Sequence, residues 1–325
     1  MPSKIEVTSK SILHFFLILG GLWLLFHIRD ILFLLFVSFI LMSGLRPSIE
    51  RLTSMKFPRP VAILIMFLLL IAVIAIFVSI IAPPLVTQTT RLITNLPNYL
   101  SQLAPFINLN FDSLLPQVGS LGQNVARLTV SIFSNIFTLI TIGVFAFYFL
   151  LERNNLRSFL EAFLGTEVGD KAIDVIKKVE VRLGAWVRGQ LLLGFIIGLS
   201  TYIGLTILGV SYALPLSLIA GVLELVPIIG PIISAVPSIL VALTISPGLA
   251  LAVVAFYIII QQLENNLIVP TVMVKTVGLP PLASLLALMI GGRLGGTLGI
   301  ILAIPILLVI QTVVQELLTN QSQAK

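Results

Sequence analysis

The sequence contains no cysteine, and its two histidines, His14 and His27, both lie within the first 30 of its 325 residues. The lack of cysteine excludes disulfide bonds, thiolate metal sites and cysteine nucleophiles. The position of the histidines excludes a serine–histidine protease mechanism deep in the chain. The motifs G-x-x-x-x-G-K-[ST] and H-E-x-x-H are also missing, which excludes ATP-driven transport by this chain alone and a zinc hydrolase. We therefore expect no enzymatic activity, no cofactor and no catalytic metal.

Charged residues are scarce as well. They make up 10% of the chain, against about 25% in a typical soluble domain. Hydrophobic residues make up 58%, and the mean hydropathy is +1.14. Because so few polar side chains could not cover a surface in water, lipid must solvate most of the chain. At about 20 residues per span plus loops, the length predicts an all-α polytopic membrane protein of about eight transmembrane or re-entrant helical segments.

The N-terminal half alternates apolar runs with polar segments. Residues 12–28 and 31–45 are apolar and are separated by Arg29 and Asp30. We expect these two runs to form a hairpin of two spans.

A third apolar run, residues 61–82, is long enough to cross a bilayer, and Pro83 and Pro84 should end it. Threonine, asparagine, glutamine and proline then replace leucine over residues 85–125, which indicates an aqueous segment. Leucines recur at helical spacing up to Leu103, so an amphipathic helix near the membrane surface is expected there.

A fourth span should follow, fully apolar from about Ile136 to Leu151. The next segment, 152–188, is dense in charge, with seven basic and six acidic residues. Apolar residues recur within it every three or four positions, which predicts one helix that leads into the next span. They are Ile173, Ile176, Val179, Leu183 and Trp186.

The distribution of basic residues predicts the orientation. The segments 46–60 and 152–188 hold eleven of the nineteen basic residues, whereas 85–125 holds one. Basic loops stay on the cytoplasmic side, so the N-terminus should be cytoplasmic and 85–125 should face outward. The net charge of +6 then reflects topology, and we expect no nucleic-acid binding.

The C-terminal half contains almost no charge. The 104 residues between Arg188 and Arg293 include only Glu224, Glu264 and Lys275 as charged side chains. A carboxylate at membrane depth costs about 2.5–3.5 kcal/mol on insertion scales. Each of these two glutamates therefore implies a partner, a proton or a water-filled cavity.

The apolar segments in this half are short and interrupted, which is typical of re-entrant hairpins at the substrate sites of secondary transporters. One candidate hairpin turns at Pro227 to Pro231, and a second turns at Gly291 to Gly299. They would enter the membrane from opposite faces, as alternating access requires. Residues 294–318 are also long enough to cross fully, which leaves the side of the C-terminus open.

Polar residues near these breaks are the candidate solute or ion path. Glu224 is interpreted as a proton carrier or as a cap of the broken helix. Gln261, Glu264 and Asn265 fall on one helical face and offer oxygens to sodium or to a polar solute, unless they form the wet end of a span. Arg293 would pair with a carboxylate, contact an anionic solute or anchor the interface. The full candidate path is Glu224, Gln261, Gln262, Glu264, Asn265, Asn266 and Arg293, and the helix-break residues are Pro227, Gly230, Pro231, Pro270, Gly291, Gly292, Gly295, Gly296, Gly299 and Pro305.

Four motifs together resemble the autoinducer-2 exporter (AI-2E) family of transporters. They are R-G-Q at 188–190, E-L-V-P-I-I-G-P at 224–231, Q-Q-L-E-N-N-L-I-V-P at 261–270 and G-G-R-L-G-G-T-L-G at 291–299. The resemblance implies a homo-oligomeric inner-membrane permease, usually drawn with eight helices. Characterised relatives export the quorum-sensing signal autoinducer-2 or exchange sodium for protons.

This chain departs from the family pattern at two places. It has Ile228 and Ile229 where many relatives have an aromatic residue, and Glu224 stands where an asparagine is also common. Both departures bear on the solute, so the substrate does not follow from the family.

We therefore expect a secondary transporter in the bacterial inner membrane. It would export a small polar solute, an autoinducer-2-like signal or another metabolite, by alternating access, with coupling to H+ or Na+ through Glu224 and Glu264. The alternatives are a Na+/H+ antiporter, a passive pore or channel, and a non-transporting scaffold. The expected division of the chain is scaffold spans 1–84, an extracytoplasmic loop 85–125, a fourth span 126–151, a cytoplasmic charged segment 152–188, a transport region 189–320 and a tail 321–325.

Overall fold

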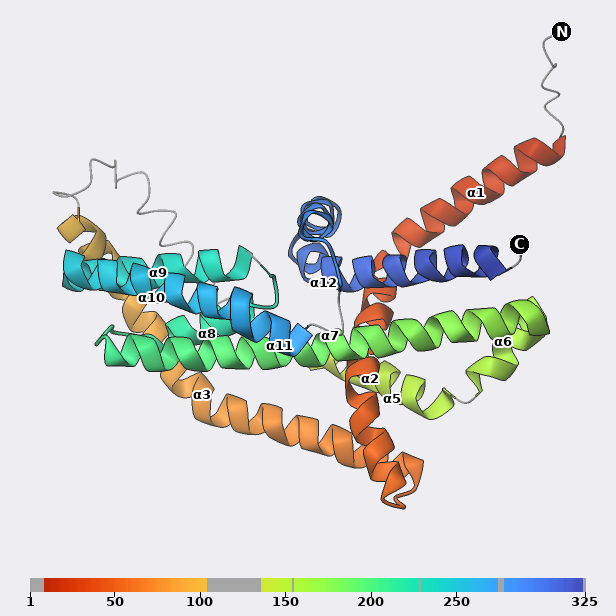
Figure 1. Ribbon diagram of the computed structural model, residues 1–325, viewed down its shortest axis with the longest axis horizontal. Helices are drawn as coiled ribbons and strands as arrows, with labels where there is room; N and C mark the ends of the chain where they lie inside the picture. Colours follow the sequence, from red (N-terminus) through yellow and green to blue (C-terminus); the bar gives the residue numbers. More distant parts are fainter. Residues whose placement is uncertain (1–8, 104–135, 154, 228, 274–277, 324–325) are drawn as a thin grey trace, which may run out of the picture.

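The computed structural model describes residues 9–103, 136–153, 155–227, 229–273 and 278–323. These residues form helices and turns and no strand (Figure 1). Five of the helices are long and apolar enough to cross a membrane, and a sixth span is possible if α5 (Ile136–Glu152) and α6 (Leu156–Leu164), bent by 79°, are taken together. The protein is therefore an all-α polytopic membrane protein, as its composition predicts.

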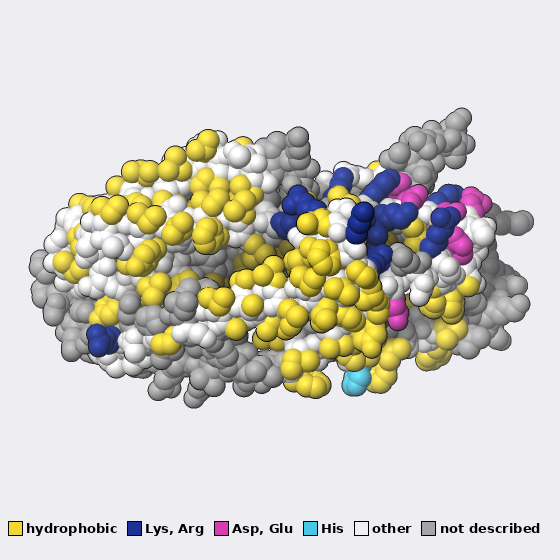
Figure 2. Space-filling model, turned by 90° about the horizontal axis from the view of Figure 1, so that it is seen from below, with side chains coloured by type: hydrophobic (Ala, Val, Ile, Leu, Met, Phe, Trp, Pro, Cys, Tyr) yellow, Lys and Arg dark blue, Asp and Glu magenta, His cyan; other side chains and the backbone are white. Residues whose placement is uncertain are grey.

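The surface separates apolar from charged regions. Many large apolar side chains are exposed, among them Phe137 at 80% and Leu294 at 79%, as expected for side chains that face lipid. Figure 2 shows hydrophobic side chains over much of the visible face, with most Lys, Arg, Asp and Glu side chains gathered toward one end. Ion pairs near this end join α6, α7 (Thr166–Ile207) and α12 (Pro281–Gln323).

The expected hairpin of residues 12–45 is wrong. Helix α1 (Ser9–His27) and helix α2 (Arg29–Ser54) are separated only by Ile28, whose carbonyl accepts hydrogen bonds from Ile31 and Leu32. The two helices meet at a bend and do not fold back on each other (Figure 1). The cause is that Asp30 suits the first turn of a helix, where its charge meets the positive end of the helix dipole. The cytoplasmic position of the N-terminus was predicted from one membrane crossing each by residues 12–28 and 31–45, and it stays a prediction.

The expected break at Pro83 and Pro84 is also wrong. Helix α3 runs from Arg59–Leu103 without interruption. A proline removes one donor from the helical ladder at a cost of about 3 kcal/mol, which the flanking turns of a long helix can absorb. The Thr87 hydroxyl also donates a hydrogen bond of 3.1 Å to the Pro83 carbonyl. The helix expected up to Leu103 thus continues the third span, and residues 104–125 of the predicted loop lie outside the described residues.

Helix α7 is the central element of the fold. It joins the second part of the charged segment, from Thr166, to the following span in one 42-residue helix, whereas the first part of that segment contains the separate helix α6. The helix predicted from the apolar stripe is thus present and continues into the span. The predicted stripe residues Val179, Leu183 and Trp186 are buried against Ile40 of α2 and Leu308 of α12. The first part of α7 therefore packs against α2 and α12, which leaves its second part to contact the C-terminal helices.

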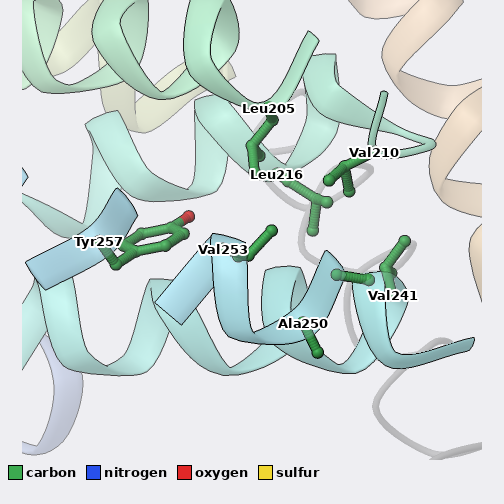
Figure 3. Close-up of a cluster of buried hydrophobic side chains, with 8 residues drawn as sticks. Leu205, Val210, Leu216, Val241, Ala250, Val253 and Tyr257 are labelled. Carbon is green, nitrogen blue, oxygen red and sulfur yellow. The ribbon is translucent and has the colours of Figure 1, made fainter. Parts of the chain in front are cut away.

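Helices α8 (Ala213–Leu223), α9 (Ile229–Ile245) and α10 (Pro247–Leu263) lie alongside the second part of α7 (Figure 1). Their core is a cluster of buried side chains from all four helices, drawn in Figure 3: Leu205, Val210, Leu216, Val241, Ala242, Ala250, Val253 and Tyr257. The Tyr257 hydroxyl is hydrogen-bonded to the Ser238 hydroxyl at 2.8 Å, which satisfies a polar group inside this apolar cluster.

Two helices in this half have irregular turns. After α10 the chain continues through a π-helical turn, η2 (Glu264–Ile268), into α11 (Val269–Met273). Pro270 therefore does not end the helix, because the wider π turn changes the bonding pattern just before it. Helix α12 contains Gly296 with non-helical φ 58° and ψ −140°, and Figure 1 shows one limb nearly end-on and the other lengthwise. The interrupted segments expected from the sequence are thus present.

Candidate functional site

Glu224 and Glu264 lie close together inside the protein, although forty positions separate them in the chain. Glu224 is the residue that ends α8, and Glu264 ends α10 and begins the π turn. Their side chains are 0% and 4% exposed, and the two carboxyl groups are close enough to interact directly. The structure therefore brings together the two isolated acids of the C-terminal half.

These carboxyl groups have few partners. Both carboxyl oxygens of Glu224 and Oε2 of Glu264 receive no hydrogen bond from the residues that the structure describes. The Gln261 side-chain amide donates to the Asn265 side chain at 3.5 Å. Within the same residues, every ion pair involves other carboxylates, so neither Glu224 nor Glu264 meets a lysine or arginine. Buried polar groups are nearly always satisfied, and such exceptions are typical of functional sites.

Close helix packing fixes the position of Glu224. The side-chain amide of Gln190 in α7 donates a hydrogen bond to the backbone carbonyl of Glu224. One turn further on, a Cβ added at Gly194 would lie 2.6 Å from the Gly221 carbonyl oxygen, and one at Gly221 would lie 2.8 Å from the Gly194 carbonyl oxygen. Only glycine permits this approach of two helix backbones. The end of α8 is therefore held directly against α7.

The break after α8 brings the next helix back against it. Glu224 is followed by a short turn that includes Pro227, and α9 begins at Ile229. A Cβ added at Gly230 would collide with the Leu223 carbonyl, and Pro231 is buried beside it. These residues define a broken helical segment with a carboxyl group at the break.

The polar block 261–266 is divided between two environments. Glu264 is buried and Gln261 is half-buried, whereas Gln262, Asn265 and Asn266 are exposed. The Asn266 side-chain amide donates to the side chain of Gln262 at 3.1 Å and to its backbone carbonyl at 2.9 Å. Gln262 and Asn266 thus satisfy each other at the surface, Gln261 donates to the exposed Asn265, and of this block only Glu264 is buried.

The structure does not place Arg293 with the two acids. Arg293 is exposed on the first limb of α12 and makes no ion pair or hydrogen bond with the described part of the chain. The glycines around it do mark a close contact, because a Cβ at either Gly291 or Gly299 would collide with the carbonyl of the other. Gly292 faces Ile300, Gly295 faces Phe33 and Pro305 is fully buried in the second limb, while Pro270 is exposed on α11.

Two buried polar residues, Gln190 and Glu180, were not identified as functional residues from the sequence. Gln190 belongs to the R-G-Q motif, but a single glutamine gives no sign of what it contacts. Glu180 lies in the charge-dense segment, yet it is 2% exposed and binds Arg46 at 2.9 Å and Arg153 at 3.1 Å. Because many other charged residues surround Glu180 in the sequence, its side chain was expected to lie on a solvent-exposed face.

A surface hollow lies apart from the two glutamates. A shallow cavity of about 470 Å³ is lined by Arg91 of α3, by α7 residues near Tyr202 and by the start of α8 near Tyr212. Because Glu224 and Glu264 are buried, the structure represents a state in which the carboxyl pair is closed to solvent and lipid.

The arrangement can hold a cation or a proton. Two carboxyl groups with free oxygens can share a proton or supply oxygen ligands to a hard cation. Glu224 also stands at the C-terminal end of α8, where the helix dipole favours positive charge. Among the described residues no cluster of three or more acidic, histidine or cysteine side chains could hold a metal ion.

Comparisons with known proteins identify the family to which the chain belongs. The sequence model of a protein family described as AI-2E family transporter matches residues 12–319. YueF of Bacillus subtilis, whose name assigns it to transport without a substrate, is 29% identical over 289 residues, covering 82% of this chain and 78% of YueF. PerM of Escherichia coli K12, named as a permease, is 24% identical over 298 residues, covering 85% and 84%. A protein of Halobacillus andaensis named sodium-lithium/proton antiporter is 26% identical over 286 residues, covering 79% and 81%.

The family match covers nearly the whole chain, and the helices long enough to cross a membrane lie inside it. This protein is therefore an integral membrane protein that belongs to the AI-2E transporter family.

Proposed function

We propose that this protein is a secondary transporter that exports a small polar solute by alternating access, with coupling to H+ or Na+. The observation that supports it most directly is the buried pair of Glu224 and Glu264, whose carboxyl groups face each other without a basic partner among the described residues. A scaffold gains nothing from such a pair, because apolar side chains of similar size would stabilise the fold at least as well.

Irregular turns favour a moving transport region. Glu224 stands at the break between α8 and α9, Glu264 opens a π turn, and α12 breaks at Gly296. Broken helices at membrane depth are typical of the substrate and ion sites of secondary transporters. We assign the transport region to residues 189–320 and the scaffold to the first spans.

Na+/H+ antiport is the second candidate, and two observations favour it. The candidate site carries two carboxyl groups and lies apart from Arg293, so its chemistry suits a cation better than an anionic solute. One relative, from Halobacillus andaensis, is named a sodium-lithium/proton antiporter.

The remaining assignments belong to the same proposal. We place the protein in the bacterial inner membrane as a homo-oligomer, with a cytoplasmic N-terminus, an extracytoplasmic segment 85–125 and a cytoplasmic segment 152–188. The lysine and arginine distribution supports the orientation, and the family resemblance supports the oligomer and a role in quorum sensing through an autoinducer-2-like signal.

The test is an untargeted comparison of culture-medium metabolites between a deletion strain and a strain that overexpresses the protein. A small polar solute should accumulate in the medium on overexpression and decrease on deletion. Purified protein in liposomes should then move this solute against its own gradient when a proton or sodium gradient is applied. A passive pore would only equalise the two sides, and identical media in both strains would contradict export.

A further inference from the structure

We propose that Glu224 and Glu264 form one occluded site that always holds two positive charges, either two protons or one proton and one sodium ion. Exchange at this site is then one sodium ion for one proton and carries no net charge. The inference rests on the proposed function, because it describes how that transport region would couple to ions.

The carboxyl groups of Glu224 and Glu264 are both buried. Neither carboxyl group reaches solvent, and both lie in the apolar half of the chain. Two ionised carboxylates held together out of water repel each other and lose their hydration, so the doubly charged state is strongly disfavoured. One bound positive charge would still leave a net negative charge in the site. Only two positive charges make the closed site neutral.

No basic side chain among the described residues neutralises the two carboxylates. Helices α8, α9, α10 and α11 carry no other Asp, Glu, Lys or Arg. On α7 the nearest charged residue along the chain, Arg188, directs its guanidinium to the carbonyls of Ser43 and Gly44 on α2. On α3, Arg91 lines the hollow at the opposite end of α8, and Tyr257 of α10 is bonded to Ser238. Lys275 lies outside the described residues. Within the described part of the chain, the balance of the pair is therefore left to mobile cations.

The free ligand atoms of the pair determine which cations can enter the site. The free acceptors are oxygens: both carboxyl oxygens of Glu224 and Oε2 of Glu264. Oxygen ligands suit small hard cations, and the negative end of the α8 dipole at Glu224 adds to the attraction. The hydrogen bond from Gln190 fixes the Glu224 backbone. This contact holds the end of α8, and with it the Glu224 carboxyl, in place beside Glu264.

The exchange step follows from these ligands. A sodium ion binds to the doubly protonated pair, one carboxylic acid O–H bond breaks, and its proton leaves to solvent in the open state. The second proton stays on the pair. The charge of the occluded site is zero before and after the exchange, so the conformational change moves no net charge through the membrane.

Binding of radioactive sodium to purified wild-type protein in nanodiscs tests the site. Sodium binding should weaken as pH falls, and adding sodium chloride to a weakly buffered sample should release one proton per sodium ion bound. The double variant Glu224→Gln/Glu264→Gln should release none and bind sodium at least about tenfold more weakly. Glu167→Gln, which removes an exposed carboxylate paired only with Lys171, is the matched control and should behave as wild type. Release without dependence on the two glutamates, or sodium binding without proton release, would overturn the proposal.

Flux in liposomes separates this proposal from the proposed function. Sodium-driven proton movement should proceed at the same rate whether valinomycin and potassium set the membrane potential positive or negative. A rate that changes with potential, or solute export that ignores sodium and protons, would refute neutral exchange and leave the transporter assignment standing. A size-exclusion profile like that of the wild type shows that the variants are folded. The number of protons released per bound sodium ion is measured on the wild-type protein, so that test does not depend on the folding of any variant.

Discussion

The side-chain amide of Gln190 donates a hydrogen bond to the backbone carbonyl of Glu224, and both residues are buried. The bond ties α7, a helix of 42 residues, to the point where α8 ends. It satisfies one of the carbonyls that a helix end leaves free, and it sets the direction from which the Glu224 carboxyl meets Glu264. A neutral side chain therefore helps to position an acidic one.

Replacing Gln190 by leucine should disrupt the candidate site without removing either acid. The Glu224 carbonyl would lose its partner while staying buried, at a cost of about 1–3 kcal/mol. We expect a lower thermal unfolding midpoint in detergent and reduced sodium-dependent flux in liposomes. Leu191→Ala changes an exposed neighbour on the same helix and should leave both readouts near wild type. Equal effects of the two substitutions would contradict a positioning role for Gln190.

The buried carboxylate of Glu180 should be important for stability at the charged end. It binds Arg46 of α2 and Arg153 after α5, whose side chains are only 21% and 20% exposed. Glu180→Gln leaves both guanidinium groups without their shared counter-charge. Loss of one member of a buried ionic cluster costs about 3–5 kcal/mol, and partial exposure of the arginines places the expected value near the lower end. Thermal unfolding followed by size-exclusion fluorescence measures it.

The matched control for Glu180 is Glu167→Gln. Glu167 pairs with Lys171 on the surface of α7, where an ion pair contributes about 0–1 kcal/mol. The interpretation of Glu180 as a structural link requires a clearly larger loss at position 180 than at position 167. Comparable losses at both positions would show that α2, α5 and α7 are held together by other contacts.

The sequence could identify the two acids but could not show that they meet. Glu224 and Glu264 are conspicuous because charge is costly at membrane depth, and this argument needs no fold. Their contact depends on how α8 packs against α7 through Gly194 and Gly221, and a pattern of small residues does not reveal which helices it joins. Arg293 was singled out by the same scarcity argument, yet it lies exposed, because long basic side chains can reach the membrane surface.

Helix positions were predicted better than helix ends. The apolar stripe from Ile173 to Trp186 correctly predicted a helix there that leads into the next span. The reversal expected at Arg29 and Asp30 and the helix end expected at Pro83 and Pro84 were wrong because each was inferred from two adjacent residues, whereas a helix end depends on the sum of local bonds and packing. The Gly296 break followed from a cluster of glycines, which is a stronger signal.

Close packing of α7 on α8 should be sensitive to one added methyl group. Gly194→Ala places a Cβ 2.6 Å from the Gly221 carbonyl oxygen, closer than real Cβ atoms approach, so the two backbones must separate. We expect a lower unfolding midpoint and weaker sodium binding, because Gln190 would move away from Glu224. Gly21→Ala is the control, since nothing lies within 4 Å of its added Cβ in α1. Alanine favours a helix over glycine by about 0.5–1 kcal/mol, so this variant should be as stable as wild type or slightly more stable.

The break in α12 gives a final pair of adjacent substitutions with opposite expectations. Gly296 has φ 58° and ψ −140°, a conformation that costs a residue with a side chain about 1–3 kcal/mol. Gly296→Ala should therefore destabilise the broken form of α12 and separate Gly291 from Gly299. Gly295→Ala adds a methyl group at ordinary contact distance, 3.8 Å from the Phe33 ring, and should be tolerated. Thermal unfolding and flux measured on both variants decide the matter: if Gly296→Ala transports and unfolds like Gly295→Ala, the break is not needed for the fold or for transport.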